Sequence, residues 1–214
     1  MRRRGAKKDD VFLGNLNFAD LHWAGELYAF GPVMKLGVFI ERDGVLNQVR
    51  VDHRHQITPM TLAEFKINPD AIPLVAKLRA AGLIVIATTN QPGLSDGRLS
   101  RRELDRMHDL LRRSMALNDI FVCPHSETDQ CPCRKPKAGL LIEAKFKWQL
   151  DLDRSFVISD KWQDAETARA AGCTSVMLKS PWVGSAHHDV LMPDLTSAVE
   201  KILQIQVPGA EIAA

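Results

Sequence analysis

The sequence predicts an α/β protein built on a doubly wound, mostly parallel sheet. Apolar runs rich in β-branched residues, typical of strands buried on both faces, occur at residues 36–40, 83–87, 120–122, 156–158 and 175–178. Segments with helical spacing of apolar residues alternate with these runs. Three of the runs end in acids or hydroxyls, and open α/β sheets bind their ligands at this end of the strands.

Length and composition limit the domain organisation and the partners. The 214 residues are 45% hydrophobic and 25% charged, which suits one domain with a sizeable core. We expect this domain over residues 34–206, an N-terminal extension over residues 1–33 that either docks or frays, and a tail over residues 207–214. A net charge of +2, with bases interspersed among acids, predicts no nucleic-acid partner.

Two further patterns bear on localisation. The basic residues before position 9 could begin a signal peptide, but no apolar segment with a cleavage site follows them, and no apolar run reaches the roughly 18 residues of a membrane span. Three of the four cysteines lie within residues 123–133, which favours metal in a reducing compartment over disulfides. We therefore expect a cytoplasmic protein without a membrane partner.

The first apolar run leads directly into two carboxylates. Glu41 and Asp43 stand two residues apart, so in an extended segment they point the same way, and Gly44 then permits a sharp turn. The pair either serves a ligand at the strand end or is a solvated acidic pair. Residues 48–61, which have no clear period, are predicted to form a loop over this strand end.

The second strand is preceded by a helix over residues 69–81 and followed by a candidate phosphate-binding turn. Thr89 and Asn90 stand directly after this strand, and Pro92-Gly93 follows them. Their side-chain and backbone donors could hold a phosphate, although the pattern is not specific by itself.

A capping box predicts the start of the next helix. Ser100 suits the N-cap position, and Glu103 follows three residues later, ahead of an apolar face that extends to Met115. The arginines on the opposite face are interpreted as a solvated surface.

A cluster of thiols and one imidazole follows the third strand and is the most specific pattern in the chain. Its members are Cys123, His125, Cys131 and Cys133. This donor set and spacing allow a tetrahedral zinc site, and since one loop supplies all four ligands, the zinc should be structural. The alternative is a chance grouping of cysteines. A zinc-pinned loop would hold Arg134 and Lys135 in place, whereas Cys173 is expected to be a small buried residue.

The fourth strand also ends in acids. A helix ending near Trp148 and a connection over residues 151–154 lead into it. Asp160 and Asp164 then stand four residues apart at the start of a helix over residues 164–171, where they could hold a hard divalent cation or cap the helix. A final helix is predicted over residues 195–203.

Together these motifs resemble the haloacid dehalogenase (HAD) superfamily of phosphatases, in its heptose bisphosphate phosphatase and histidinol-phosphatase branch. The resemblance runs from about residue 35 to about residue 203. It rests on Glu-Arg-Asp-Gly-Val-Leu-Asn, Thr-Asn-Gln-x-Gly, Cys-x-His-x5-Cys-x-Cys-Arg-Lys-Pro and Ser-Asp-Lys-x-x-Asp, in the family's order. It implies a HAD-like Rossmannoid fold with a minimal cap domain or none, and a small phosphorylated substrate.

The resemblance also implies roles for individual residues. Asp43 would be the general acid/base, paired with the acid at position 41. The groups that bind phosphate or substrate would be Thr89, Asn90, Arg134, Lys135 and Lys161. The groups that hold or support Mg²⁺ would be Glu41, the Asp43 carbonyl, Asp160 and Asp164. The expected cofactors are therefore Mg²⁺ and a structural Zn²⁺.

One position departs from the family pattern. Glu41 stands where the family has its nucleophilic aspartate. A glutamate can form an acyl phosphate, but one extra methylene moves the carboxylate by roughly 1 Å, and such a displacement costs on the order of 100-fold in rate. Two functions therefore remain: Mg²⁺-dependent hydrolysis of a small phosphomonoester such as a heptose 1,7-bisphosphate, or a silent homologue that binds or senses a sugar phosphate. Removal of phosphate from nucleic-acid ends is a third function, which the near-neutral charge disfavours.

Overall fold

The computed structural model describes residues 34–206, and the expectations for residues 1–33 and 207–214 lie outside this range. Its principal strands are β1 (Lys35–Glu41), β4 (Ile84–Asn90), β5 (Asp119–Cys123), β6 (Leu150–Ser159), β7 (Thr174–Leu178) and β8 (Val190–Met192). They form one sheet in the order β5-β4-β1-β6-β7-β8, and all neighbouring strands run parallel. The five predicted strands are all present, which confirms the doubly wound sheet.

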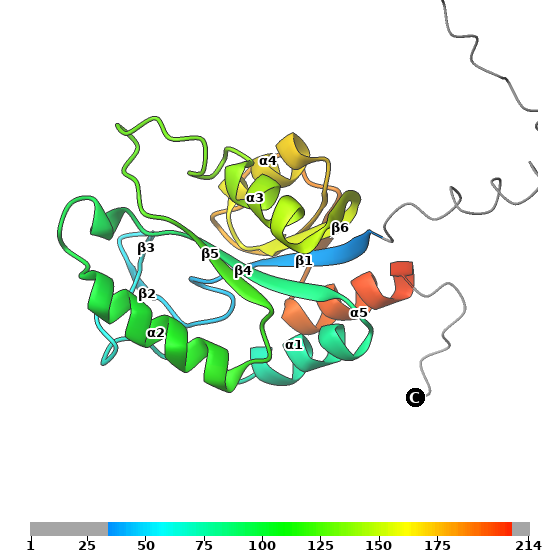
Figure 1. Cartoon of the computed structure of the whole chain (residues 1–214), viewed down its shortest axis with the longest axis horizontal. Coiled ribbons are helices and arrows are strands. Elements are labelled where there is room, and N and C mark those ends of the chain that lie inside the picture. The colour runs from blue at the N-terminus through cyan, green and yellow to red at the C-terminus, as the bar shows by residue number, and fades with distance from the viewer. Residues whose placement is uncertain (1–33, 207–214) are drawn as a thin grey trace, which may run out of the picture. The chain divides into compact units, whose positions relative to one another are not determined.

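Helices cover both faces of this sheet (Figure 1). One face carries α1 (Ala71–Ala80), α2 (Arg101–Ser114) and α5 (Leu195–Gln206), and the other carries α3 (Gly139–Trp148) and α4 (Trp162–Ala171). Alternate residues of β1 supply the two cores: Val38 and Ile40 pack in the first, and Phe39 packs in the second. A strand buried on both faces requires an unbroken apolar run, which is why the sequence revealed it.

The order of the strands decides where a ligand site can form. From β1 the chain moves outward to β4 and β5 and then returns to β6 on the other side of β1. The carboxyl ends of β1, β4 and β6 therefore meet at the point where the winding reverses, and the crevice of such a fold opens there.

The prediction that residues 151–154 form a connection is wrong, because these residues belong to β6. Leu150 and Leu152 are both buried, and Leu150 pairs with Lys35 at the start of β1. The exposed charges of Asp153 and Arg154 concealed this alternation, which is the pattern of a strand.

Two further elements were not expected from the sequence. The predicted loop 48–61 contains a hairpin of β2 (Arg50–Asp52) and β3 (His55–Ile57). Its turn places His53 and Arg54 at φ values of 43° and 69°, a conformation usually marked by Gly or Asn, so no turn signal was present. The three-residue strand β8 was missed because it is too short to show a period.

The start of α2 follows the prediction, whereas α4 begins at Trp162 rather than at residue 164 and α5 ends at Gln206 rather than at residue 203. The Ser100 hydroxyl accepts a hydrogen bond from the Glu103 N–H at 3.2 Å, as in a capping box. In a full capping box the Glu103 carboxylate would also accept from the Ser100 N–H. Here it accepts instead from Leu62 N–H at 2.7 Å and from Arg106 at 2.7 Å. A 3₁₀ helix, η2 (Pro92–Leu94), follows β4, and Cys173 is buried as expected.

Within residues 34–206, no helix combines the length and the apolar character needed to cross a membrane. Between β1 and α1 the described chain adds the β2–β3 hairpin and no further domain, in agreement with a minimal cap.

Candidate active site and metal centre

A cavity of about 440 Å³ opens at the carboxyl ends of β1, β4 and β6. Its wall includes the hairpin residues Gln56 and Ile57, together with Arg98 after η2. The predicted site residues that line it are Glu41, Asp43, Asn90, Arg134, Lys135, Lys161 and Asp164. The fold thus brings together groups that lie more than 120 residues apart in the chain, in a volume that suits a small molecule.

Glu41 ends β1 and is buried beneath this cavity. Its Oε2 forms an ion pair with the Lys135 ammonium, and its Oε1 accepts a hydrogen bond from the Asp43 N–H at 3.0 Å. Burial by itself would raise the pKa of Glu41, but Lys135 and Lys161 outweigh it and hold the pKa low. The carboxylate is therefore ionised at neutral pH.

Lys135 connects Glu41 to a second buried acid. Its ammonium lies 2.8 Å from Asp164 Oδ1, and Asp164 Oδ2 accepts from the Ser159 hydroxyl at 2.9 Å. Burial raises the pKa of Asp164 to about 6, and the nearby Glu41 charge adds to this rise although Lys135 opposes it. One ammonium cannot neutralise two carboxylates, so Asp164 remains easier to protonate than Glu41.

Asp43 is held by more donors than any other predicted site residue. Arg42 donates to it from Nη2 at 2.8 and 2.9 Å and from Nε at 3.1 Å. Gln91 donates at 2.7 Å and the Thr89 hydroxyl at 3.3 Å. The Thr89 side chain is therefore directed to Asp43, and the phosphate contact expected of Thr89 stays a prediction.

Lys161 marks the point where the oxygens expected to bind magnesium converge. Its ammonium contacts the main-chain carbonyl of Asp43, lies 3.1 Å from Asp160 Oδ1 and lies 3.9 Å from Glu41 Oε1. These are hard oxygen donors of the kind Mg²⁺ prefers, and they already face one cation. The donor set fits the predicted ion, whereas both Asp164 oxygens are engaged by Lys135 and Ser159.

The turn after β1 brings Asp160 close to the backbone. Gly44 has φ +98°, and a Cβ at this position would lie 2.8 Å from Asp160 Oδ2. The same carboxylate oxygen accepts from Gln56 Nε2 at 2.5 Å, so the β2–β3 hairpin is tied to the predicted metal ligand. Gly44 is therefore required both for its backbone conformation and for the close approach.

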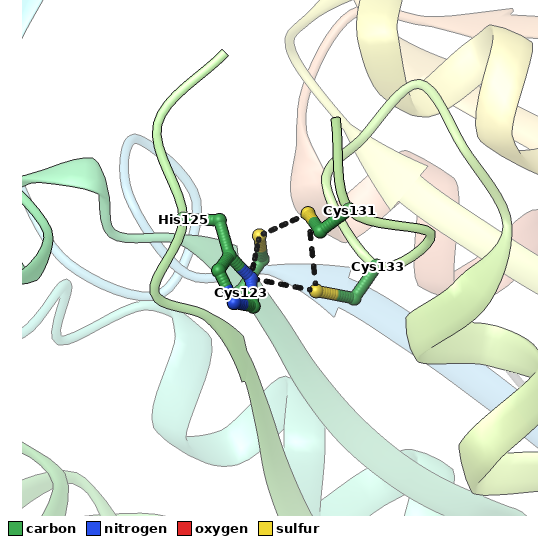
Figure 2. Close-up of side chains that lie close together, drawn as sticks. All are labelled: Cys123, His125, Cys131 and Cys133. Atoms are coloured by element: carbon green, nitrogen blue, oxygen red, sulfur yellow. Dashed lines mark hydrogen bonds between the residues drawn. The ribbon is translucent and has the colours of Figure 1, made fainter. Parts of the chain in front are cut away.

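The four predicted zinc ligands converge as well (Figure 2). Their donor atoms all lie within 4.8 Å of one another, and four of the separations are between 3.3 and 3.7 Å. A tetrahedral zinc with bonds of about 2.3 Å would place sulfur ligands roughly 3.8 Å apart. The cysteines are free thiols, and Cys123, His125, Cys131 and Cys133 therefore fit a metal site.

The protonation of this cluster is linked to metal binding, because thiols bind a metal as thiolates. Burial, together with the sulfurs of Cys123 and Cys131, raises the pKa of Cys133 to about 12. Burial also raises the pKa of Cys123, although the hydrogen bonds to His125 and Cys133 oppose this rise. Burial opposes ionisation of Cys131 too, but hydrogen bonds from Cys133 and its surroundings lower its pKa to about 7. The cluster can thus carry little more than one negative charge unless a metal ion is bound.

The loop that carries the predicted zinc ligands, residues 123–133, is called the metal loop here. It is joined to the cavity through two contacts. Arg134 donates from Nη1 to the carbonyl of His125 at 3.2 Å. The Asn90 amide bonds both main-chain groups of Lys135, accepting from its N–H and donating to its carbonyl at 3.2 Å each. In this structure the Asn90 side chain therefore positions Lys135.

Sequence reasoning missed four side chains that support the site. Arg42 and Gln91 lie inside motifs that were recognised, and their position between predicted site residues was the available signal. Gln56 lies in a stretch without periodicity, and His108 lies on the apolar face of α2. No local pattern distinguished these two from ordinary polar residues.

Comparisons with known proteins agree with this geometry. A family model described as HAD-hydrolase-like matches residues 132–194. The chain is 34% identical over 148 residues to the D-glycero-beta-D-manno-heptose-1,7-bisphosphate 7-phosphatase of Pseudomonas aeruginosa, with 67% of this chain and 80% of that protein covered. It is also 34% identical over 140 residues to the histidine biosynthesis bifunctional protein HisB of Campylobacter jejuni subsp. doylei, with 63% and 39% covered.

A solved structure matches the fold over most of the chain. The D,D-heptose 1,7-bisphosphate phosphatase from B. bronchiseptica, complexed with magnesium and phosphate, aligns with a TM-score of 0.70 at 29% identity, covering 80% of this chain and 99% of that chain. On the strength of these relationships, the chain belongs to the HAD-like phosphatases, in the family of the heptose bisphosphate phosphatases.

Proposed function

We propose that this protein is a Mg²⁺-dependent phosphatase of a small sugar bisphosphate, of the class of D-glycero-D-manno-heptose 1,7-bisphosphate, and that it releases the 7-phosphate. The observation that carries the proposal is the cavity in which Glu41, Asp43 and Lys135 meet at the carboxyl ends of β1 and β4. The names of the relatives support the substrate class and the position of the phosphate. Free cysteines support a reducing compartment such as the cytoplasm.

The proposed chemistry is a double displacement. The ionised Glu41 carboxylate attacks phosphorus, the bond from phosphorus to the sugar oxygen breaks, and protonated Asp43 gives its proton to that oxygen. Water then attacks the acyl phosphate, Asp43 takes the proton of the water, and inorganic phosphate leaves while the Glu41 carboxylate is restored. Lys135 neutralises charge on the transferring group, and Arg134 contacts the substrate side.

Two metals belong to the proposal. Glu41, the Asp43 carbonyl and Asp160 would hold Mg²⁺, which when bound stabilises the charge on the phosphoryl oxygens. Lys161 would then move from the position that its ammonium occupies toward the substrate. Zn²⁺ in the cysteine and histidine cluster would fix the loop that carries Arg134 and Lys135.

A second candidate, a silent binder of sugar phosphates, is favoured by one observation. Both oxygens of Glu41 have partners, because Oε2 pairs with Lys135 and Oε1 accepts from the Asp43 N–H. A carboxylate of this length and with these contacts could bind a phosphate ligand nearby without reaching phosphorus in line. A displacement of about 1 Å is enough to cost on the order of 100-fold in rate.

The deciding experiment measures phosphate release from a panel of sugar phosphates, including heptose 1,7-bisphosphate, with and without Mg²⁺. It compares the natural protein with Glu41→Asp and with Asp43→Asn. We expect slow Mg²⁺-dependent turnover by the natural protein, faster turnover by Glu41→Asp, and loss of turnover in Asp43→Asn.

The outcomes separate the two candidates. Activity that appears only after Glu41→Asp, together with protection of the natural protein by the same ligand against thermal unfolding, would favour the silent binder. Absence of both turnover and ligand protection would contradict both functions.

A further inference from the structure

Arg42 is a fully buried cation beside the predicted general acid/base. Its side chain is 0% exposed, and its Nε and Nη2 donate to the Asp43 carboxylate. The Phe65 ring lies against the guanidinium, with 5.5 Å from Cζ to the ring centroid. A guanidinium removed from water in this way needs acceptors for each of its nitrogens, or the remaining donors are left unpaired at a cost.

His108 supplies the acceptor that Asp43 does not. Its Nε2 lies 3.0 Å from Arg42 Nη1, on the side of the guanidinium that faces α2. A guanidinium can only donate, so Nε2 must carry the lone pair and the ring proton must be on Nδ1. The imidazole is 4% exposed and shares its helix face with Leu104, Met107 and Leu111.

The charge state of this histidine follows from its surroundings. Burial, together with the charge of Arg42, lowers the pKa of His108 to about 3. A second cation beside Arg42 is thereby avoided, so no charge repulsion separates the imidazole from the guanidinium.

We propose that His108 is a positioning residue for the phosphatase reaction: its imidazole fixes Arg42, and Arg42 in turn holds the Asp43 carboxylate at the cavity. This assignment rests on the proposed function. His108 does not line the cavity, so it acts on the reaction only through the guanidinium. Without the acceptor, Nη1 would have to find another partner, and the guanidinium would turn away from the plane in which it grips Asp43.

The test uses two substitutions at position 108 and one matched control. His108→Leu removes the acceptor, whereas His108→Gln keeps an oxygen that can accept from Arg42. Leu111→Ala, one turn along the same buried face, removes packing without changing the partners of Arg42. Steady-state kinetics on the best sugar phosphate would be measured for each, normalised to the folded fraction.

We expect His108→Leu to lower kcat by at least on the order of 10-fold. A displacement of the Asp43 carboxylate by about 1 Å would cost roughly 100-fold, and a smaller displacement would cost less. KM should stay within about twofold, since the interaction acts on the transition state. His108→Gln should restore most of kcat, and Leu111→Ala should reduce stability while kcat stays near that of the natural protein. A His108→Leu protein that loses stability but keeps its kcat would overturn the assignment.

A second measurement is independent of turnover. Nitrogen-15 spectra of histidine-labelled protein, with His108→Gln used to identify the signal, report which ring nitrogen carries the proton. An unprotonated Nε2 whose shift changes in Arg42→Lys is expected, and a protonated Nε2 would overturn the proposal. A natural protein without turnover on any phosphate would contradict the proposed function, and the nitrogen shifts would then decide the His108–Arg42 contact separately.

Discussion

The Lys135 ammonium forms an ion pair with the Glu41 carboxylate, and the two side chains are only 2% and 4% exposed. The same ammonium also pairs with buried Asp164. One cation beneath the cavity thus joins Glu41, which is 94 positions from Lys135 in the sequence, to Asp164, which is 29 positions from it. The buried charges at this site depend on one another, and removing the central one should reveal this.

Lys135→Met should destabilise the protein by about 3 to 5 kcal/mol, because it leaves buried Asp164 without its cation and buried Glu41 with only the more distant Lys161. Denaturant unfolding at neutral pH would measure the change. Lys147→Met is the matched control, since Lys147 is 59% exposed in its ion pair with Asp119. Such an exposed pair contributes only about 0 to 1 kcal/mol. Equal losses in the two variants would contradict the buried ion-pair network.

Gly44→Ala should strain the backbone and, in addition, weaken magnesium binding through a clash with Asp160. The new Cβ would lie 2.8 Å from Asp160 Oδ2 and displace a predicted ligand. Gly82→Ala is the control, because Gly82 also has a positive φ, +82°, but nothing lies within 4 Å of its added Cβ. Both variants should lose about 1 to 2 kcal/mol from the left-handed backbone.

The measurement for this pair is thermal unfolding with and without Mg²⁺. The rise in Tm caused by Mg²⁺ should disappear in Gly44→Ala and persist in Gly82→Ala. A full Mg²⁺ effect in Gly44→Ala would mean that the ion does not depend on this position of Asp160.

Gly139→Ala should loosen the metal loop. A Cβ at Gly139 would lie 2.4 Å from the carbonyl oxygen of Pro132 and 2.8 Å from Cys133 Cα, so the backbone between the ligands must shift. We expect the variant to lose its zinc to a chelator faster than the natural protein, measured as release to a colorimetric zinc indicator. Glu143→Ala, at an exposed position of the same helix, should release zinc at the natural rate. Unchanged retention in Gly139→Ala would show that the loop tolerates the shift.

The buried imidazole of His108 should contribute to acid sensitivity. Its pKa is about 3 in the folded protein and ordinarily near 6.5, so between these values the unfolded chain binds a proton that the folded chain does not. This contribution to the free energy of unfolding is present above pH 6.5 and is lost as the pH falls, by up to about 1.4 kcal/mol per pH unit.

Urea unfolding at several pH values between 4 and 7 would compare the natural protein with His108→Gln, at fixed Zn²⁺ and Mg²⁺. The natural protein should lose stability more steeply toward acid than the variant. Parallel curves for the two proteins would mean that His108 is not buried as a neutral ring.

The local sequence determined most strands and the cluster predicted to bind zinc. Val38, Phe39 and Ile40 lie in a strand covered on both faces, so burial required an unbroken apolar run that could be recognised directly. The four predicted zinc ligands lie within eleven positions of one loop, so their spacing was visible without the fold. Leu150 and Leu152 were overlooked because the neighbouring charges of β6 interrupt the same kind of signal.

Only the tertiary structure decided which polar groups share a partner. Since the carboxyl ends of parallel strands meet at one edge of a sheet, the sequence indicated that five side chains would share one crevice: Glu41, Asp43, Thr89, Lys135 and Asp160. It did not indicate that Arg42 turns inward to His108, because that contact joins positions 66 residues apart and has no periodic signature. Local patterns report burial and chain direction, whereas the pairing of buried charges depends on distances that exist only after the chain has folded.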